Sequence, residues 1–158
     1  MIKIIACGKL KEKWMKEGIA EYIKRIRPYD KIEVIEVPDE KAPETNSAAE
    51  NEQVKIVEGQ RLLKNVRDDE YLILLDLAGQ DIDSVALANK IQDCYNHARS
   101  KITFVIGGSL GLSNELIQRA DFRWRISKAT FPHQICRILV VEQIYRSFRI
   151  LHNEPYHK

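Results

Sequence analysis

The chain has 158 residues, the size of one ordinary domain, and a chain of this length can bury a core without disulfide or metal staples. Its composition, with 44% hydrophobic and 30% charged residues, excludes disordered, collagen-like and fibrous proteins, and no apolar run is long enough to span a bilayer. The formal net charge of +2 does not by itself indicate a polyanionic partner.

The start of the chain predicts a strand, a helix and a second strand. Residues 2–6 are a short β-rich run that lacks the longer apolar region of a secretory signal. Residues 11–26 place apolar side chains at helical spacing among Lys and Glu, and Pro28 ends that helix. Residues 31–37 alternate Ile and Val with Glu, which is typical of a strand.

An acidic loop at 38–46 separates this strand from the next helix. Ser47 is the predicted N-cap of that helix, Glu50 completes a capping box, and the helix is expected to run to about Asn65. Residues 71–76 are nearly all apolar, which is typical of a strand buried on both faces of a parallel sheet.

The middle of the chain continues the alternation. Residues 78–80 predict a turn, and Asp83 or Ser84 is the predicted cap of a helix that runs to about Ala98. Residues 102–106 predict a second fully buried strand.

The end of the chain predicts a glycine-rich loop, a short helix, a strand and a long helix. The loop spans 107–111, the short helix 114–119 and the strand 122–126. Pro132 is expected at the first position of the long helix, which ends near Leu151.

Strict alternation of strands and helices predicts one α/β domain, residues 1–158, with a mostly parallel sheet and helices on both faces. Ligands in such open sheets bind beyond the carboxyl ends of the strands. Three loops lie there late in the chain, at 76–80, 107–111 and 127–133. We therefore expect these loops to converge on a site.

The glycine loop does not match the common phosphate-binding patterns. Ser109 replaces the second glycine of a dinucleotide fingerprint, and no Gly-Lys-Ser/Thr follows. In the loop at 126–133, Pro132 holds Phe131 extended, which can offer backbone groups to a planar ring. Structural alternatives stay open for both loops: a turn without a ligand, and a plain connection with Lys128 solvated and His133 hydrogen-bonded at a helix start.

The last helix is apolar around most of its circumference, so we expect it to be buried on more than one side, with a second copy of the chain on its second side. Glu142 and Arg146 lie on its polar row, where an ordinary ion pair four residues apart is the alternative to a functional role. The tail Tyr156–Lys158 combines an aromatic, an imidazole and a cation, which could stack on a base and neutralise a phosphate. A frayed, inert terminus is the alternative.

Charge is distributed unevenly along the chain. Residues 1–30 carry +4, residues 31–120 carry −6, and residues 121–158 carry +4. The basic ends form one positive face if the termini meet in the fold, and ordinary surface scatter is the alternative.

The cysteines are three in number and far apart, with no Cys-x-x-Cys or Cys/His cluster: Cys7, Cys94 and Cys136. We therefore expect no metal site, and free thiols suit a reducing cytoplasm.

Four motifs, in this order, resemble those of one family: FVIGGSLG at 104–111, SKATFPHQ at 127–134, VEQIYR at 141–146 and YHK at 156–158. The segments 8–11 and 36–41 and the helix around Tyr22 match as well. Over essentially the whole chain they resemble the small bacterial large-subunit methyltransferases of the SPOUT class, which methylate N3 of a pseudouridine in 23S rRNA. Lys158 stands where some members have Arg, which keeps the charge but loses the bidentate fork.

The resemblance implies a SPOUT-type α/β fold with a carboxyl-terminal trefoil knot, S-adenosyl-L-methionine as the cofactor, and a homodimer in which the carboxyl-terminal tail reaches the active site. By motif match, the cofactor pocket should be lined by Leu75, Gly107, Ile126, Ser127, Lys128, Ala129, Thr130 and Phe131. The target it implies is a pseudouridine in helix 69 of 23S rRNA, on the assembled large subunit or ribosome, in the cytoplasm.

Methylation at N3 requires loss of the imide proton, either to a base or with a cation that favours the deprotonated form. We expect Arg146 to be that cation and His157 to be a base or a base-contact residue. Tyr156, His157 and Lys158 are the candidate RNA-binding residues.

Two other classes stay open. One is a non-catalytic ribosome-associated binding protein with the same fold. The other is a flavodoxin-type nucleotide or flavin domain, which needs a hydroxyl-rich phosphate loop after the first strand, and Cys7–Lys11 is not one.

Overall fold

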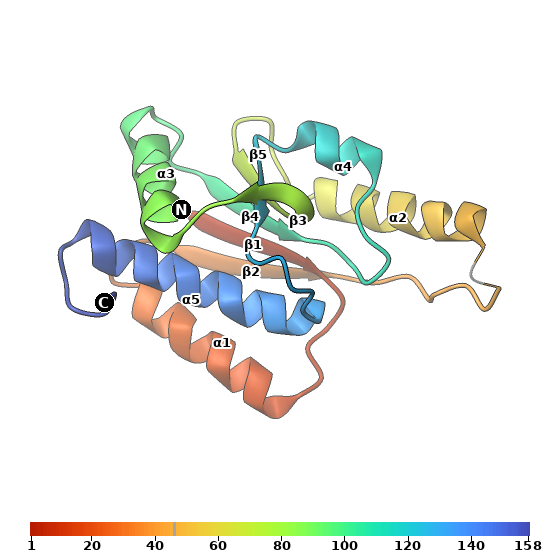
Figure 1. Ribbon diagram of the computed structural model, residues 1–158, viewed down its shortest axis with the longest axis horizontal. Coiled ribbons are helices and arrows are strands. Elements are labelled where there is room, and N and C mark those ends of the chain that lie inside the picture. Colours follow the sequence, from red (N-terminus) through yellow and green to blue (C-terminus); the bar gives the residue numbers. More distant parts are fainter. Residues whose placement is uncertain (46) are drawn as a thin grey trace.

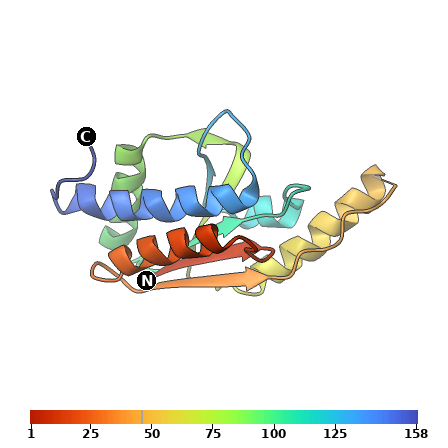
Figure 2. The same ribbon diagram turned by 90° about the horizontal axis from the view of Figure 1, so that it is seen from below.

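The computed structural model of the protein describes residues 1–45 and 47–158, which form a parallel sheet with helices on both faces (Figures 1 and 2). Strands and helices alternate: β1 (Ile2–Cys7), α1 (Lys13–Ile26), β2 (Ile32–Val37), α2 (Ala48–Leu63), β3 (Tyr71–Asp81), α3 (Ser84–Asn96), β4 (Ile102–Ile106), α4 (Asn114–Arg119), β5 (Phe122–Arg125) and α5 (His133–Leu151). The strand order is β2-β1-β4-β3-β5, and every neighbouring pair is parallel. The predicted α/β class is confirmed.

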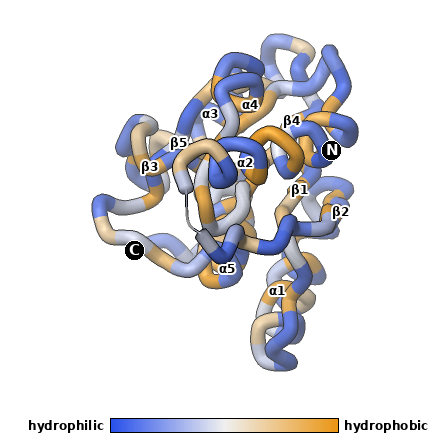
Figure 3. The backbone as a smooth tube through the Cα atoms, turned by 90° about the vertical axis from the view of Figure 1, so that its right-hand side faces the viewer, coloured by the Kyte–Doolittle hydropathy of each residue, from blue (hydrophilic) through white to orange (hydrophobic). Residues whose placement is uncertain are grey.

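Each face of the sheet has its own hydrophobic core. α1, α3 and α5 cover one face through buried side chains that include Ile19, Leu87 and Val140. α2 and α4 cover the other face through Leu62 and Leu116. α5 lies between α1 and α3 (Figure 1), so the two basic ends of the chain do meet. α1 alternates hydrophobic and hydrophilic segments along its length (Figure 3), as a helix with one buried side must.

The predicted turn at 78–80 is wrong, because these residues lie in a bulge inside β3. Leu75 and Gln80 both pair with Trp124 of β5, so the four residues between them leave the ladder. A Cβ atom on Gly79 would lie 2.6 Å from a backbone oxygen of β5. Only glycine allows β3 to pass so close to its neighbour.

The cap of α2 is formed as predicted, but the capping box is not complete. The Ser47 Oγ accepts a hydrogen bond from the Glu50 N–H at 3.2 Å. The Glu50 carboxylate accepts from the Thr45 hydroxyl instead of returning to the Ser47 N–H. Asn46, in the predicted loop 38–46, lies outside the described residues.

Other boundaries differ from the predictions by one or two residues. Asp83, and not Ser84, caps α3. Pro132 is the N-cap of α5, one position before the predicted one. α1 begins two residues late at Lys13, α2 and α3 each end two residues early, and β5 ends one residue early at Arg125.

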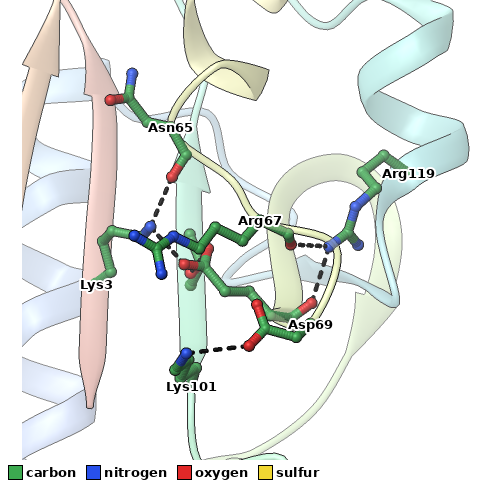
Figure 4. A network of polar contacts seen from close by, with 8 residues as sticks. Lys3, Asn65, Arg67, Asp69, Lys101 and Arg119 are labelled. Atoms are coloured by element: carbon green, nitrogen blue, oxygen red, sulfur yellow. Dashed lines mark hydrogen bonds and ion pairs between the residues drawn. The ribbon is translucent and has the colours of Figure 1, made fainter.

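A buried ion pair connects the amino ends of β1 and β4 to the α2–β3 connection (Figure 4). The Lys3 Nζ lies 2.6 Å from both a Glu70 carboxylate oxygen and the Asn65 carbonyl. The other Glu70 oxygen accepts from the Thr103 hydroxyl at 2.8 Å, and Arg119 donates to the Glu70 carbonyl at 2.9 Å. This network stabilises the end of the sheet at which the strands begin. The candidate site lies at the opposite end, beyond the carboxyl ends of the strands.

Candidate active site

The three loops expected to converge do line one pocket, with a volume of about 660 Å³. Its walls come from the β3 bulge, the glycine loop after β4 and the connection from β5 to α5. Most wall residues are apolar, and two of the protein's exposed large hydrophobic side chains, Leu77 and Phe131, belong to it. Its size and lining are typical of a site for a small organic molecule.

Seven of the eight expected cofactor residues line this pocket: Leu75, Gly107, Ile126, Ser127, Ala129, Thr130 and Phe131. Lys128, the eighth, is exposed and is not part of the lining. The Ser127 Oγ accepts from the Ala129 N–H at 3.0 Å, a local turn whose middle residue is Lys128. That Lys128 contacts the cofactor stays a prediction.

Several pocket residues were not singled out from the sequence. The Asp76 carboxylate, largely buried, pairs with Arg123 at 2.6 Å, and both side chains belong to the lining residues. Trp124 comes from the same short strand. The one sequence signal for Asp76 is an acidic residue directly after a nearly all-apolar strand. Nothing in the sequence of β5 marks Arg123 or Trp124 as pocket residues.

The glycine loop has structural reasons for its glycines as well as a place in the pocket wall. A Cβ on Gly107 would lie 2.6 Å from a Leu112 methyl group, and one on Gly108 would lie 2.6 Å from the Glu58 Oε1. Gly111 has a φ of +108°, which favours glycine. The backbone conformation of Gly111 and the contact of Gly108 with the buried Glu58 therefore favour glycine at these two positions even without a ligand.

Glu58 is a buried carboxylate directly behind this loop, only 4% exposed. Its Oε2 accepts from the Glu40 N–H at 3.0 Å and from the Cys7 thiol at 3.3 Å. Burial first, and the charge of Glu58 second, raise the pKa of Cys7 to about 12, so the thiol stays protonated and donates. The Glu58 Oε1 has no partner among the described residues and lies at Gly108.

His133 lines both the large pocket and a small polar cavity next to Glu58. Burial, and then the charge of Arg137, lower the pKa of His133, while Asp39 and Glu58 oppose the shift. The ring is therefore neutral at pH 7. The hydrogen bond that the structural alternative anticipated for His133 is not formed with any described residue.

The carboxyl-terminal tail folds back onto α5 and is not frayed. Arg146 donates two hydrogen bonds to Glu142, at 3.0 and 2.6 Å, and the Tyr156 hydroxyl donates to the same carboxylate at 3.0 Å. The Arg146 guanidinium lies 4.7 Å from the Tyr156 ring centroid and 3.1 Å from the His157 Nδ1. Glu142 raises the pKa of Arg146. Lys158 is exposed.

This tail cluster, Glu142, Arg146, Tyr156 and His157, lies apart from the pocket of the same chain. The last pocket residue on α5 is Cys136. Arg146 lies ten residues further along the helix, about 15 Å at 1.5 Å per residue. The structure thus brings together seven of the eight expected cofactor residues, and separately the two expected catalytic residues, but does not join the two groups.

Across residues 1–45 and 47–158, no group of three or more His, Cys, Asp or Glu side chains is placed to hold a metal ion. Over the same residues, no helix combines the length and apolar character that crossing a bilayer requires.

Comparisons with known proteins match nearly the whole chain to one family. Residues 1–157 match the model of the family described as predicted SPOUT methyltransferase. Proteins named ribosomal RNA large subunit methyltransferase H from Alkaliphilus oremlandii, Carboxydothermus hydrogenoformans and Ruminiclostridium cellulolyticum are 52%, 50% and 50% identical to it. Each alignment covers 99% of both chains. The chain therefore belongs to the SPOUT methyltransferase family.

Proposed function

We propose that this protein transfers a methyl group from S-adenosyl-L-methionine to N3 of a pseudouridine in helix 69 of 23S rRNA, on the assembled large subunit or ribosome in the cytoplasm. The observation that carries the proposal is the pocket formed by three loops, in a chain about half identical over its full length to proteins named as large-subunit rRNA methyltransferases. The trefoil knot implied by the resemblance stays a prediction.

The pocket residues fit this cofactor. The backbone N–H groups of Thr130 and Phe131 have no partner in the part of the chain that the structure describes, so they are free to bind a polar ring edge beside apolar walls. Gly107 and Gly111 let the backbone approach a ligand closely. A sulfonium cofactor carries no phosphate, which agrees with a glycine loop that lacks a phosphate-binding lysine. When bound, S-adenosyl-L-methionine supplies a methyl group activated on sulfur.

The separation of the pocket from the tail cluster supports a homodimer with composite sites. Ile135 and Leu139 of α5 are half-buried and lie outside both core clusters. With Glu142 and Arg146 they form one stripe at helical spacing. A second copy that covers this stripe through a two-fold interface can bring its tail cluster to the pocket of the first.

Within the tail cluster the geometry favours one of the two expected roles of His157. A guanidinium only donates, so the Nδ1 that faces Arg146 accepts, and the Nε2 of the neutral ring carries the proton. His157 is therefore set to donate to a base rather than to remove its proton. Arg146, held by Glu142, supplies the cation that stabilises a deprotonated imide.

The test is methyl transfer by the purified protein, with S-adenosyl-L-methionine, to ribosomes that lack the modification, read by mass spectrometry of digested 23S rRNA. We expect one methyl group in the helix 69 fragment, and much slower transfer to protein-free rRNA because a domain this small needs a composite surface. Ribosome binding without transfer would favour the non-catalytic alternative. Equal rates on protein-free rRNA would refute the assembled substrate.

A further inference from the structure

An exposed tryptophan surrounded by lysines lies at the start of α1, outside the proposed site. The Trp14 side chain is 56% exposed, whereas Trp usually buries most of its surface. We call this the Trp14 surface, and its members are Trp14 with the exposed residues Lys9, Lys11, Lys13 and Lys16. Glu12 is the only acidic residue between them, so residues 9–16 carry a formal charge of +3.

The cations of the Trp14 surface are largely free. Lys13 lies 3.7 Å from Glu17, and both side chains are exposed, so that pair contributes little. Among the ion pairs and side-chain hydrogen bonds of the described residues, none involves Lys9, Lys11 or Lys16. These charges are available to an anionic partner.

The loop at which the Trp14 surface begins lies beside the pocket. The loop that carries its first two lysines is fastened to α5, because the Gly8 carbonyl accepts from Arg137 at 2.7 Å. Glu36 pairs with Arg137 at 2.5 Å and accepts from the Leu10 N–H at 3.0 Å. An ideal Cβ on Gly8 would lie 3.8 Å from the His133 Nε2, and His133 lines the pocket. The first turns of α1 and α5 lie at the same end of the molecule (Figures 1 and 2).

We propose that the Trp14 surface docks an unpaired segment of the rRNA substrate next to the pocket. The indole stacks on a base, and the lysines neutralise neighbouring phosphates. An exposed aromatic ring among free cations is the combination that binds single-stranded RNA with little sequence preference. A second copy of the chain fits less well, because a two-fold contact there would set like charges against each other. This inference rests on the proposed rRNA substrate.

The test compares ribosome binding by variants loaded with S-adenosylhomocysteine, which blocks turnover, at several salt concentrations. The surface variants are Trp14→Ala, Trp14→Phe and the pair Lys9→Ala/Lys11→Ala. The matched control is the pair Lys24→Ala/Lys64→Ala, which removes the same charge at positions outside the surface. Cofactor affinity and subunit state are measured for each variant.

We expect Trp14→Ala to weaken ribosome binding by about fivefold or more, the effect of losing one base stack, and Trp14→Phe to restore most of it. The Lys9/Lys11 pair should lower the slope of log affinity against log salt by about one for each phosphate that is no longer neutralised. The control pair should change neither. Dimerisation and cofactor affinity should be unchanged throughout.

Wild-type binding by Trp14→Ala and by the Lys9/Lys11 pair would overturn the inference. A dissociated dimer in Trp14→Ala would also overturn it, since the surface would then be a subunit interface. An equal loss in the control pair would show a general charge effect and reject a specific surface. If the wild-type protein binds ribosomes but transfers no methyl group, the proposed function fails, while the same variant comparison still decides the docking surface.

Discussion

Gly108 both lines the large pocket and packs closely against a buried side chain. A Cβ added to it would lie 2.6 Å from the Oε1 of the buried Glu58. Glu58 is held from the other side by the Cys7 thiol and the Glu40 N–H, so it cannot move away without losing both hydrogen bonds. We therefore expect a side chain at Gly108 to displace the loop toward the pocket.

Gly108→Ala should accordingly destabilise the protein by about 1–3 kcal/mol, the usual effect of overpacking, and weaken S-adenosyl-L-methionine binding about tenfold. Calorimetric titration and thermal unfolding measure the two effects. The matched control is Gly18→Ala in α1, where an added Cβ meets nothing within 4 Å and the helix should gain about 0.5–1 kcal/mol. Unchanged cofactor affinity in Gly108→Ala would contradict this account of the loop.

His133 gives the protein a pH dependence that can be assigned. Burial and Arg137 lower its pKa from the ordinary 6.5, so the unfolded chain binds a proton at a higher pH than the folded one. Its contribution to stability is therefore fully present above pH 6.5 and is lost as the pH falls through the folded-state pKa. We expect His133→Gln to lose less free energy of unfolding than the wild type between pH 7.5 and about pH 5, as measured by urea denaturation. Parallel curves would contradict the shift.

At the scale of elements, the strands were the most predictable part of the fold. Residues 71–76 and 102–106 could be assigned because strands buried on both faces are nearly all apolar. The bulge in β3 could not be predicted, because it depends on the close approach of β5 at Gly79. The hydrogen bond from the Thr45 hydroxyl to the Glu50 carboxylate could not be predicted either, because a capping-box pattern does not exclude a competing hydroxyl donor.

The buried Lys3–Glu70 pair joins β1 to the α2–β3 connection. Removing one partner should lower the free energy of unfolding much more than replacing both partners by apolar residues. Glu70→Ala leaves the Lys3 ammonium buried without a counter-charge and should destabilise the protein by about 3–5 kcal/mol. The double variant Lys3→Met/Glu70→Leu should recover much of that loss. Cofactor affinity should stay unchanged, because the pair lies near the amino ends of the strands and the pocket lies beyond their carboxyl ends. A double variant as unstable as the single one would contradict this reading.

For the whole molecule, the sequence could predict that loops after successive parallel strands converge, because that follows from sheet topology. It could not predict where Arg146 lies relative to the pocket, since helical spacing places it on a polar row but not beside any loop. Nor could it identify the Trp14 surface, because exposure of a tryptophan at helical spacing is set by what packs against it.

The central claim is that methyl transfer to rRNA uses the pocket of one subunit and the tail cluster of another. The direct measurement mixes two inactive variants in equal amounts and lets them exchange subunits. Ala129→Trp blocks the pocket and is first checked for lost cofactor binding, and Arg146→Ala retains the pocket. Half of the dimers are then mixed and each holds one intact composite site, so we expect about a quarter of wild-type transfer to ribosomes. Activity no higher than that of either variant alone would contradict the claim.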